Sequence, residues 1–138
     1  MNITKQYIAG FIDGEGYLGI IKKTSKVCTL GYYYTPVIKI AQISRNDEVL
    51  IAIQKFIGHG NLEPRKSNLK NAADSTSLEF RGMKRVTPIA KKLLPYLIVK
   101  KKQAQILLKF SRLSSDEERT ELYNRIRLLN KRGLATTE

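Results

Sequence analysis

The N-terminal part of the chain passes from a helical to a strand-like spacing of apolar residues. Apolar positions three and four residues apart predict a helix over residues 3–13. These positions are Ile3, Tyr7, Ile8, Phe11 and Ile12. Residues 17–27 and 32–44, rich in β-branched and aromatic side chains, follow, and Gly31 lies between them. This pattern predicts two strands joined in a hairpin.

Alternation along this hairpin assigns its side chains to two faces of a sheet. The predicted core face carries Leu18, Ile20, Ile38 and Ile40. The opposite face mixes polar, cationic, β-branched and aromatic positions, namely Gly19, Ile21, Lys23, Ser25, Tyr33, Thr35, Val37 and Lys39. Such a face can lie against a nucleic acid.

A second helix and a second hairpin come next. Asn46 or Ser44 can cap the helix, which Gly58 would end. Its predicted buried stripe is Val49, Leu50, Ile53, Phe56 and Ile57. Residues 61–67 and 75–81 are the predicted strands of the hairpin, with Leu78 and Phe80 facing the core.

The C-terminal part predicts three more helices. Thr87-Pro88 has the pattern of an N-cap followed by proline at the first helical position, and that helix would end before Pro95. Residues 101–113 and a segment from Ser114 to about Lys131 predict the last two helices.

The resulting element order, α-β-β-α-β-β-α with extra helices, predicts an α+β fold. We expect one antiparallel four-stranded sheet with helices on one face. A length of 138 residues fits a single domain, with a core over about residues 1–113 and a C-terminal helix and loop over 114–138.

Composition excludes several classes of protein. No apolar run approaches the length of a membrane span, and no secretory signal is visible in the first residues. Cys28 and His59 each stand alone, so we expect neither an intrachain disulfide nor a zinc site.

The formal net charge of +13 is unevenly distributed. Residues 17–46 contain lysines and arginine but no carboxylate, and residues 64–109 are strongly basic, with Asp74 and Glu79 as their acids. Blocks of this kind indicate a surface for a polyanion. A membrane is the weaker alternative, because no long basic amphipathic helix with bulky aromatics is present.

Residues 8–16, Ile-Ala-Gly-Phe-Ile-Asp-Gly-Glu-Gly, place carboxylates at the end of the first helix. Ala9 with Asp13 and Gly10 with Gly14 are pairs four residues apart, so one stripe of the helix carries little side-chain bulk. A second helix can pack there closely. We expect the glycines after Asp13 to adopt the left-handed or strained backbone of a C-terminal cap. A carboxylate at this end opposes the helix dipole, and a bound cation would reverse that effect.

Residues 7–16 resemble the signature of the LAGLIDADG homing endonucleases. Ile8 corresponds to the first Leu of the signature, Phe11-Ile12 to Leu-Ile, and Glu15 to the second Asp. The element order resembles the family fold across about the first 110 residues. One copy of the signature is similar to the branch that works as homodimers. This resemblance implies that the interface comprises Tyr7, Ala9, Gly10, Phe11 and Asp13.

Hydrolysis of a phosphodiester calls for an activated water and a cation near the scissile phosphate, and Mg²⁺ can serve both needs. Because Mg²⁺ keeps several waters, the Glu15 carboxylate, the Gly14 carbonyl and DNA phosphates can suffice as ligands. Mn²⁺ or Ca²⁺ can substitute as bound ions. The resemblance further implies that Gln42 positions water and that Lys100 stabilises phosphate charge or assists proton transfer, with Lys101 or Lys102 as substitutes.

A two-stranded ribbon fits the DNA major groove, so both hairpins are candidates for contact with double-stranded DNA. Arg65 and Arg81 are candidate guanine readers. Further candidates are Lys23, Ser25, Tyr33, Thr35 and Lys39. Lys131 and Arg132 belong to a segment that resembles a phosphate-gripping loop of the family. Asn46 departs from the arginine that some members use to order active-site water.

These observations lead to the hypothesis of a homodimeric, Mg²⁺-dependent endonuclease that cuts a long pseudo-palindromic DNA site and promotes intron mobility. An intron-splicing protein that binds intron RNA is the alternative, and a transcription regulator on the same scaffold lacks support. An organelle, such as a chloroplast or mitochondrion, or the cytoplasm of a prokaryote or phage host would each fit such a gene.

Overall fold

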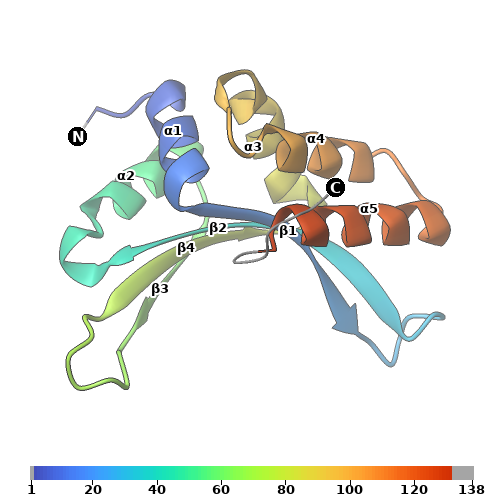
Figure 1. The fold of residues 1–138 in the computed structure, drawn as a ribbon, viewed down its shortest axis with the longest axis horizontal. Coiled ribbons are helices and arrows are strands. Elements are labelled where there is room, and N and C mark those ends of the chain that lie inside the picture. Colours follow the sequence, from blue (N-terminus) through green and yellow to red (C-terminus); the bar gives the residue numbers. More distant parts are fainter. Residues whose placement is uncertain (1, 132–138) are drawn as a thin grey trace.

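The computed structural model describes residues 2–131 and contains one antiparallel sheet with every helix on the same side of it (Figure 1). The helices are α1 (Lys5–Glu15), α2 (Glu48–Ile57), α3 (Met83–Leu93), α4 (Lys101–Phe110) and α5 (Asp116–Leu129). The strands are β1 (Gly16–Thr24), β2 (Tyr32–Ile43), β3 (Asn61–Arg65) and β4 (Ser75–Arg81). The predicted fold class and element order are confirmed.

The sheet has the strand order β1-β2-β4-β3, so β2 and β4 are inner strands. Gly16 lies opposite Ile40, and Ile38 lies opposite both Leu18 and Phe80. All the predicted core positions of these strands are at most 2% exposed: Leu18, Ile20, Ile38, Ile40, Leu78 and Phe80. The two-residue period therefore gave the correct register and the correct face.

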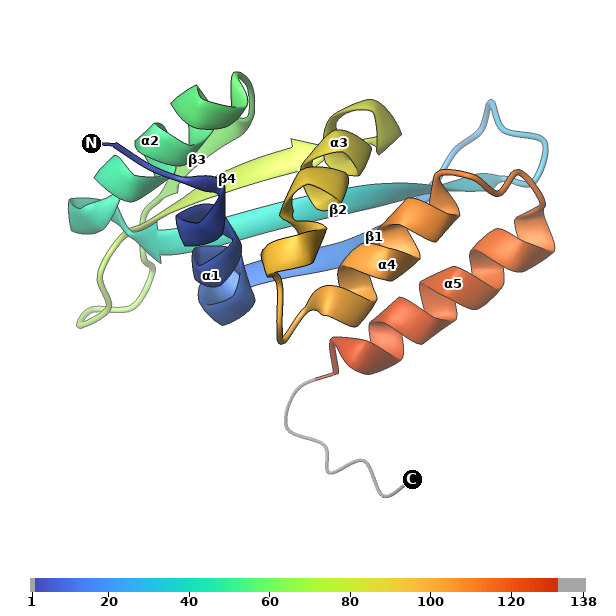
Figure 2. The same ribbon diagram turned by 90° about the horizontal axis from the view of Figure 1, so that it is seen from above.

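The arrangement leaves the second face of the sheet open. In Figure 1 the sheet is arched, and the β1–β2 and β3–β4 hairpin tips project away from the helices at its two ends. Seen from above in Figure 2, α1 and α2 lie over one end of the sheet, and α5 runs along the edge formed by β1. No helix among residues 2–131 is long and apolar enough to cross a membrane.

Local signals for two helix starts were wrong. Neither Ser44 nor Asn46 caps α2; both lie in a 3-10 turn, and Asp47 precedes the helix without a side-chain cap. Phe56, expected in the buried stripe, is 41% exposed, whereas Leu50 and Ile53 are fully buried. Gly58 ends α2 with φ of 97°, as predicted.

The third helix begins four residues earlier than Thr87. It starts at Met83 after Gly82, whose φ of 95° favours glycine, and Pro88 lies within it. Pro88 removes the N–H that would bond to the Lys84 carbonyl. Burial of Val86 and Ile89 on either side of Pro88 keeps this turn helical in spite of that loss.

Candidate functional site

Glu15 is the last residue of α1, and its side chain is exposed rather than directed into the core. The strand β1 begins at the next residue, Gly16, with no linker. A Cβ on Gly16 would lie 2.8 Å from the Ile12 carbonyl oxygen, so only glycine permits this abrupt change from helix to strand. Glu15 is thereby held at the joint between α1 and the sheet.

The predicted left-handed glycine cap does not form here. Gly14 is helical, and Gly16 is extended with φ of −91° and ψ of 165°. The Gly16 N–H instead donates to the Ile12 carbonyl and closes the helix. Gly16 is needed because the Ile12 carbonyl lies close to it, and Gly14 leaves the helix surface without a side chain. Neither glycine has a positive φ.

Asp13 and Lys100 join the end of α1 to the loop before α4. The Asp13 carboxylate accepts the Ile98 N–H at 2.7 Å through Oδ2 and the Lys100 N–H at 3.0 Å through Oδ1. The Lys100 ammonium donates to the Asp13 carbonyl at 2.6 Å. An ammonium at the C-terminal end of a helix offsets the negative end of its dipole. These bonds bring Lys100 within two residues of Glu15 along α1, although 85 positions separate Lys100 from Glu15 in the sequence.

Gln42 lies near the end of β2, two residues beyond Ile40, which pairs with Gly16. The register therefore brings Gln42 toward the end of α1. Its Oε1 accepts the Ile43 N–H at 3.0 Å, and its Nε2 group donates to no acceptor among residues 2–131. The water-positioning role of Gln42 stays a prediction.

One chain alone offers few ligands to a metal ion. Residues 2–131 contain no group of three or more His, Cys, Asp or Glu side chains that could hold one. The Asp13 carboxylate is already committed to backbone N–H groups. The exposed Glu15 carboxylate and the neighbouring Gly14 carbonyl remain. That set fits Mg²⁺ only if phosphate oxygens, waters or a second chain complete the coordination.

The outward face of α1 carries an aromatic ridge beside a bare stripe. Tyr7 is 51% exposed and stacks on Phe11, with ring centroids 6.2 Å apart. A Cβ on Gly10 or Gly14 would meet nothing within 4 Å. Ala9 is fully buried in the core of its own chain, so its assignment to the interface is wrong. The small-residue stripe is Gly10 with Gly14, and Ala9 packs inward instead.

The open face of the sheet collects most of the predicted DNA contacts. Cross-strand pairs place Lys23 opposite Tyr33, and Lys39 opposite Glu79. Alternation puts six candidates on this face: Lys23, Tyr33, Thr35, Lys39, Arg65 and Arg81. Arg65 is the last residue of β3, next to the β3–β4 hairpin tip, and Lys23 is close to the β1–β2 tip. Because these two tips lie at opposite ends of the arch in Figure 1, the basic groups span its length. A duplex that follows the arch can reach both ends.

Two positions on this face, Val37 and Gly19, differ from the exposed surface that the alternation predicted. Val37 is only 1% exposed, opposite Gly19 and Arg81. A Cβ on Gly19 would lie 2.2 Å from the Tyr17 hydroxyl oxygen, so a larger residue here would require the Tyr17 ring to move aside. Burial raises the pKa of the Tyr17 hydroxyl; Tyr123 adds to that rise and Arg127 opposes it. Tyr17 is therefore a neutral hydroxyl at neutral pH.

The remaining predicted contacts are peripheral or lie outside the described residues. Ser25 lies in the β1–β2 loop, where its hydroxyl accepts the Val27 N–H and its own N–H donates to Gly31. Lys131 follows α5 and is exposed. The prediction for Arg132 falls outside residues 2–131.

The structural role of Asn130 was missed by sequence reasoning. Its Nδ2 donates to the Leu18 carbonyl at 2.8 Å, and its Oδ1 accepts from the buried Gln103 at 3.3 Å. Because β1 is an edge strand, the Leu18 carbonyl has no neighbouring strand on that side. Asn130 thus fastens the end of α5 to the sheet. Nothing in the local sequence signals a contact across 112 residues.

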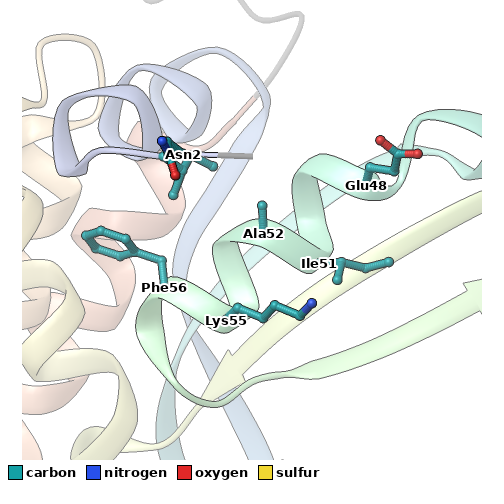
Figure 3. A pocket seen from close by; sticks show the side chains of 7 residues that line it. Asn2, Glu48, Ile51, Ala52, Lys55 and Phe56 are labelled. Carbon is teal, nitrogen blue, oxygen red and sulfur yellow. The ribbon is translucent and has the colours of Figure 1, made fainter.

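A separate hollow lies away from this site. It measures about 590 Å³ and lies between the N-terminal segment and α2, lined by Asn2, Ile3, Glu48, Ile51, Ala52, Lys55 and Phe56 (Figure 3). None of the predicted catalytic or DNA-contacting residues lines it.

Asp13→Asn tests the link between α1 and the loop before α4. One carboxylate oxygen becomes an NH₂ group that faces a backbone N–H, so the N–H of Ile98 or of Lys100 loses its charged acceptor. We expect the free energy of unfolding to fall by about 1–3 kcal/mol, measured by urea denaturation. Asp47→Asn is the control, since Asp47 makes no side-chain cap, and it should change stability by less than about 0.5 kcal/mol. Equal stability of the two variants would contradict the anchoring role.

Comparison with known proteins identifies the family to which this chain belongs. The family model described as LAGLIDADG endonuclease matches residues 8–114. The DNA endonuclease I-CvuI of Chlorella vulgaris is 26% identical over 133 residues, which cover 94% of this chain and 78% of I-CvuI.

Solved structures agree on the fold. I-CvuI in complex with its target in the presence of Ca superposes with a TM-score of 0.80 at 23% identity, covering 97% of this chain and 85% of that one. The archaeal intron-encoded homing endonuclease I-Vdi141I complexed with DNA gives a TM-score of 0.75 at 23% identity, covering 97% and 88%. With the family model matching most of its length, this chain belongs to the LAGLIDADG endonuclease family.

Proposed function

We propose that two copies of this chain form a homodimer that cuts both strands of a long pseudo-palindromic DNA site with the help of a divalent cation, Mg²⁺ in the cell. Family membership establishes the endonuclease class of activity. The assembly, the metal and the individual residue roles go beyond it. The observation that carries the proposal is the position of exposed Glu15 at the end of a helix whose outward face carries the small-residue stripe of Gly10 and Gly14.

The dimer is supported by the surface around Gly10 and Gly14. A Cβ on either glycine would meet no atom of residues 2–131 within 4 Å, and Tyr7 is exposed one helical turn before Gly10. The loop that Asp13 anchors adds Ile98 and Val99, which are 83% and 71% exposed. Large exposed apolar side chains around a helical stripe of small residues are typical of a protein interface. Packing of α1 against α1 across a two-fold axis would cover this surface.

The same two-fold axis accounts for cleavage of both strands. Each α1 ends in a Glu15, so two glutamates would lie near the axis, one for each scissile phosphate. When bound, a divalent cation lowers the pKa of its water and neutralises charge that develops on phosphate. Glu15 and the Gly14 carbonyl would hold it, together with DNA oxygens.

Two further groups of the chain assist in this proposal. Lys100 is fixed by its own N–H on Asp13, so its ammonium stays near the end of α1 and can turn from the Asp13 carbonyl to a phosphate oxygen. Gln42 retains a free Nε2 that can donate to a water. The open face of the sheet, with its basic groups at both ends, would lie in the major groove. No observation favours binding of intron RNA as a separate function.

A cleavage selection tests the proposed function. The protein is incubated with duplexes of random sequence, with and without Mg²⁺, and the broken ends are sequenced. We expect double-strand breaks within one recurrent pseudo-palindromic sequence, and only with the metal present. Cleavage without sequence preference, or equal cleavage in chelator, would overturn the proposal.

Salt dependence tests the basic face. If about six phosphates are neutralised, affinity should fall about a thousandfold between roughly 50 and 200 mM salt, because counterions are released at each contact. The slope of log K against log salt is measured by fluorescence anisotropy. Arg65→Ala would reduce that slope if Arg65 contacts a phosphate, whereas Lys55→Ala on the helix side should leave it unchanged. A nearly flat response of the unsubstituted protein would contradict the model.

A further inference from the structure

Glu79 is an acidic residue on the open face of the sheet, which it shares with four basic residues and one other acid: Lys23, Lys39, Arg65, Arg81 and Glu63. It lies on the inner strand β4, directly opposite Lys39 on β2 and Asn61 on β3. Its side chain is 20% exposed. A carboxylate at this place repels phosphate, so general attraction to the DNA backbone does not explain it.

Glu79 fixes the direction of Arg81, two residues further along the same strand face. The Arg81 Nε and Nη2 both donate to one carboxylate oxygen, Oε1, at 2.7 and 2.6 Å. Within residues 2–131 this is the sole ion pair. Hydrogen bonds between charged partners of this kind restrict a guanidinium to one orientation.

The pair leaves a defined set of hydrogen-bonding groups unused. Arg81 still offers Nη1 and the second N–H of Nη2, and Glu79 still offers Oε2, with no other partner for either side chain among residues 2–131. The Arg81 side chain is 42% exposed. Two parallel donors therefore stand beside one acceptor on the open face of the sheet.

That set complements one base pair. In the major groove, guanine presents the two acceptors N7 and O6, and its paired cytosine presents the N4 amino donor. Donors on Arg81 and an acceptor on Glu79 match all three groups. In an A·T pair, the adenine N6 amino donor would face an Arg81 donor, and the thymine O4 acceptor would face the Glu79 acceptor. Neither contact can form a hydrogen bond. A phosphate matches only the arginine and is repelled by the glutamate.

We propose that Glu79 and Arg81 act as a unit that reads one G·C base pair in each half of the DNA site, with Glu79 as the specificity-determining residue that both positions Arg81 and accepts from cytosine. This inference rests on the proposed function, because it requires the open sheet face to lie in the major groove. It explains why a carboxylate lies on a surface that binds a polyanion.

The test compares base preferences of five proteins: the unsubstituted chain, Glu79→Ala, Arg81→Ala, the double variant with both of these substitutions, and Glu63→Ala. Each is used to select duplexes from a random pool in Ca²⁺, and the retained sequences give the preference at every position. Glu63 is the matched control, since it lies on the same sheet face and forms no ion pair with an arginine of residues 2–131. Thermal unfolding checks that each variant is folded.

We expect one symmetric pair of positions to be G·C in the sites selected by the unsubstituted chain and by Glu63→Ala. Glu79→Ala and Arg81→Ala should both lower the preference for G·C at that same pair of positions by about tenfold, with other positions retained. The double substitution should be no worse than either single one, because the two side chains act together.

Three results would overturn the inference while leaving the proposed function intact. They are an unchanged profile in Glu79→Ala, relaxation at different positions by the two substitutions, and a uniform loss of affinity in Arg81→Ala, which indicates a phosphate contact. A flat profile of the unsubstituted chain at every position would instead defeat the proposed function, and this inference with it.

Discussion

Glu15→Gln should abolish cleavage and leave DNA binding nearly intact. The substitution keeps the size of the side chain and removes the charge that would hold a divalent cation. Because a metal supplies several kcal/mol of transition-state stabilisation, the single-turnover rate should fall by at least about a thousandfold. Affinity for the selected site, measured in Ca²⁺, should stay within about threefold, since phosphate and base contacts supply most of the binding energy.

Because Glu15 is exposed, the experiment separates an effect on cleavage from an effect on folding. The side chain is not part of the core and accepts no hydrogen bond from residues 2–131, so Gln at this position should not alter folding. Glu121→Gln provides the same chemical change on an exposed position of α5 and should cut at the normal rate. Normal-rate cleavage by Glu15→Gln would show that the metal is held elsewhere.

The sequence predicted those parts of the molecule that are determined by burial on one face. Strand alternation in β1 and β2 placed Ile20 and Ile38 in the core correctly, because a shift of one residue would expose every apolar side chain of a strand. The position of Glu15 at the end of a helix followed from the spacing of Ile8 and Ile12 in the same way.

Local capping signals were less reliable than burial. Thr87-Pro88 has the composition of a helix start, yet α3 begins at Met83. Val86 is fully buried one residue before Thr87, and burial of such a side chain contributes about 1.5–3 kcal/mol. That gain is comparable to the cost of about 3 kcal/mol for proline inside a helix, and Ile89 and Leu93 extend the same buried face. Tertiary packing therefore decided where the helix starts.

The contacts that complete the candidate site depend on chain segments far apart in the sequence. Asp13 looked like an interface residue, but its carboxylate holds the N–H groups of Ile98 and Lys100. A spacing of 85 or 87 residues carries no periodic signal, and neither does the Asn130 bond to Leu18. Glu79 was likewise noted only as an acid among bases, because the bond to Arg81 depends on the rotamers of both side chains.

Gly10→Leu should separate the proposed dimer without unfolding the chain. A Cβ on Gly10 meets nothing within 4 Å, so the larger side chain fits the protomer. Leucine is also the better helix former by about 0.8 kcal/mol, so the thermal stability of the isolated chain should stay equal or rise. At the two-fold axis, two leucines would force the helices apart, at a cost of about 1–3 kcal/mol each. The dissociation constant of the dimer should therefore rise by about 30-fold or more, as measured by analytical ultracentrifugation.

Cleavage provides a second measurement of the same effect. A monomer brings one Glu15 to the DNA, so Gly10→Leu should lose double-strand breaks at protein concentrations that suffice for the unsubstituted chain. Raising the concentration should restore part of the activity, because mass action re-forms the dimer. Gln105→Leu places the same side chain on an exposed position of α4 and should leave both assembly and cleavage unchanged. An intact dimer in Gly10→Leu would mean that the bare stripe of α1 is not where the two copies meet.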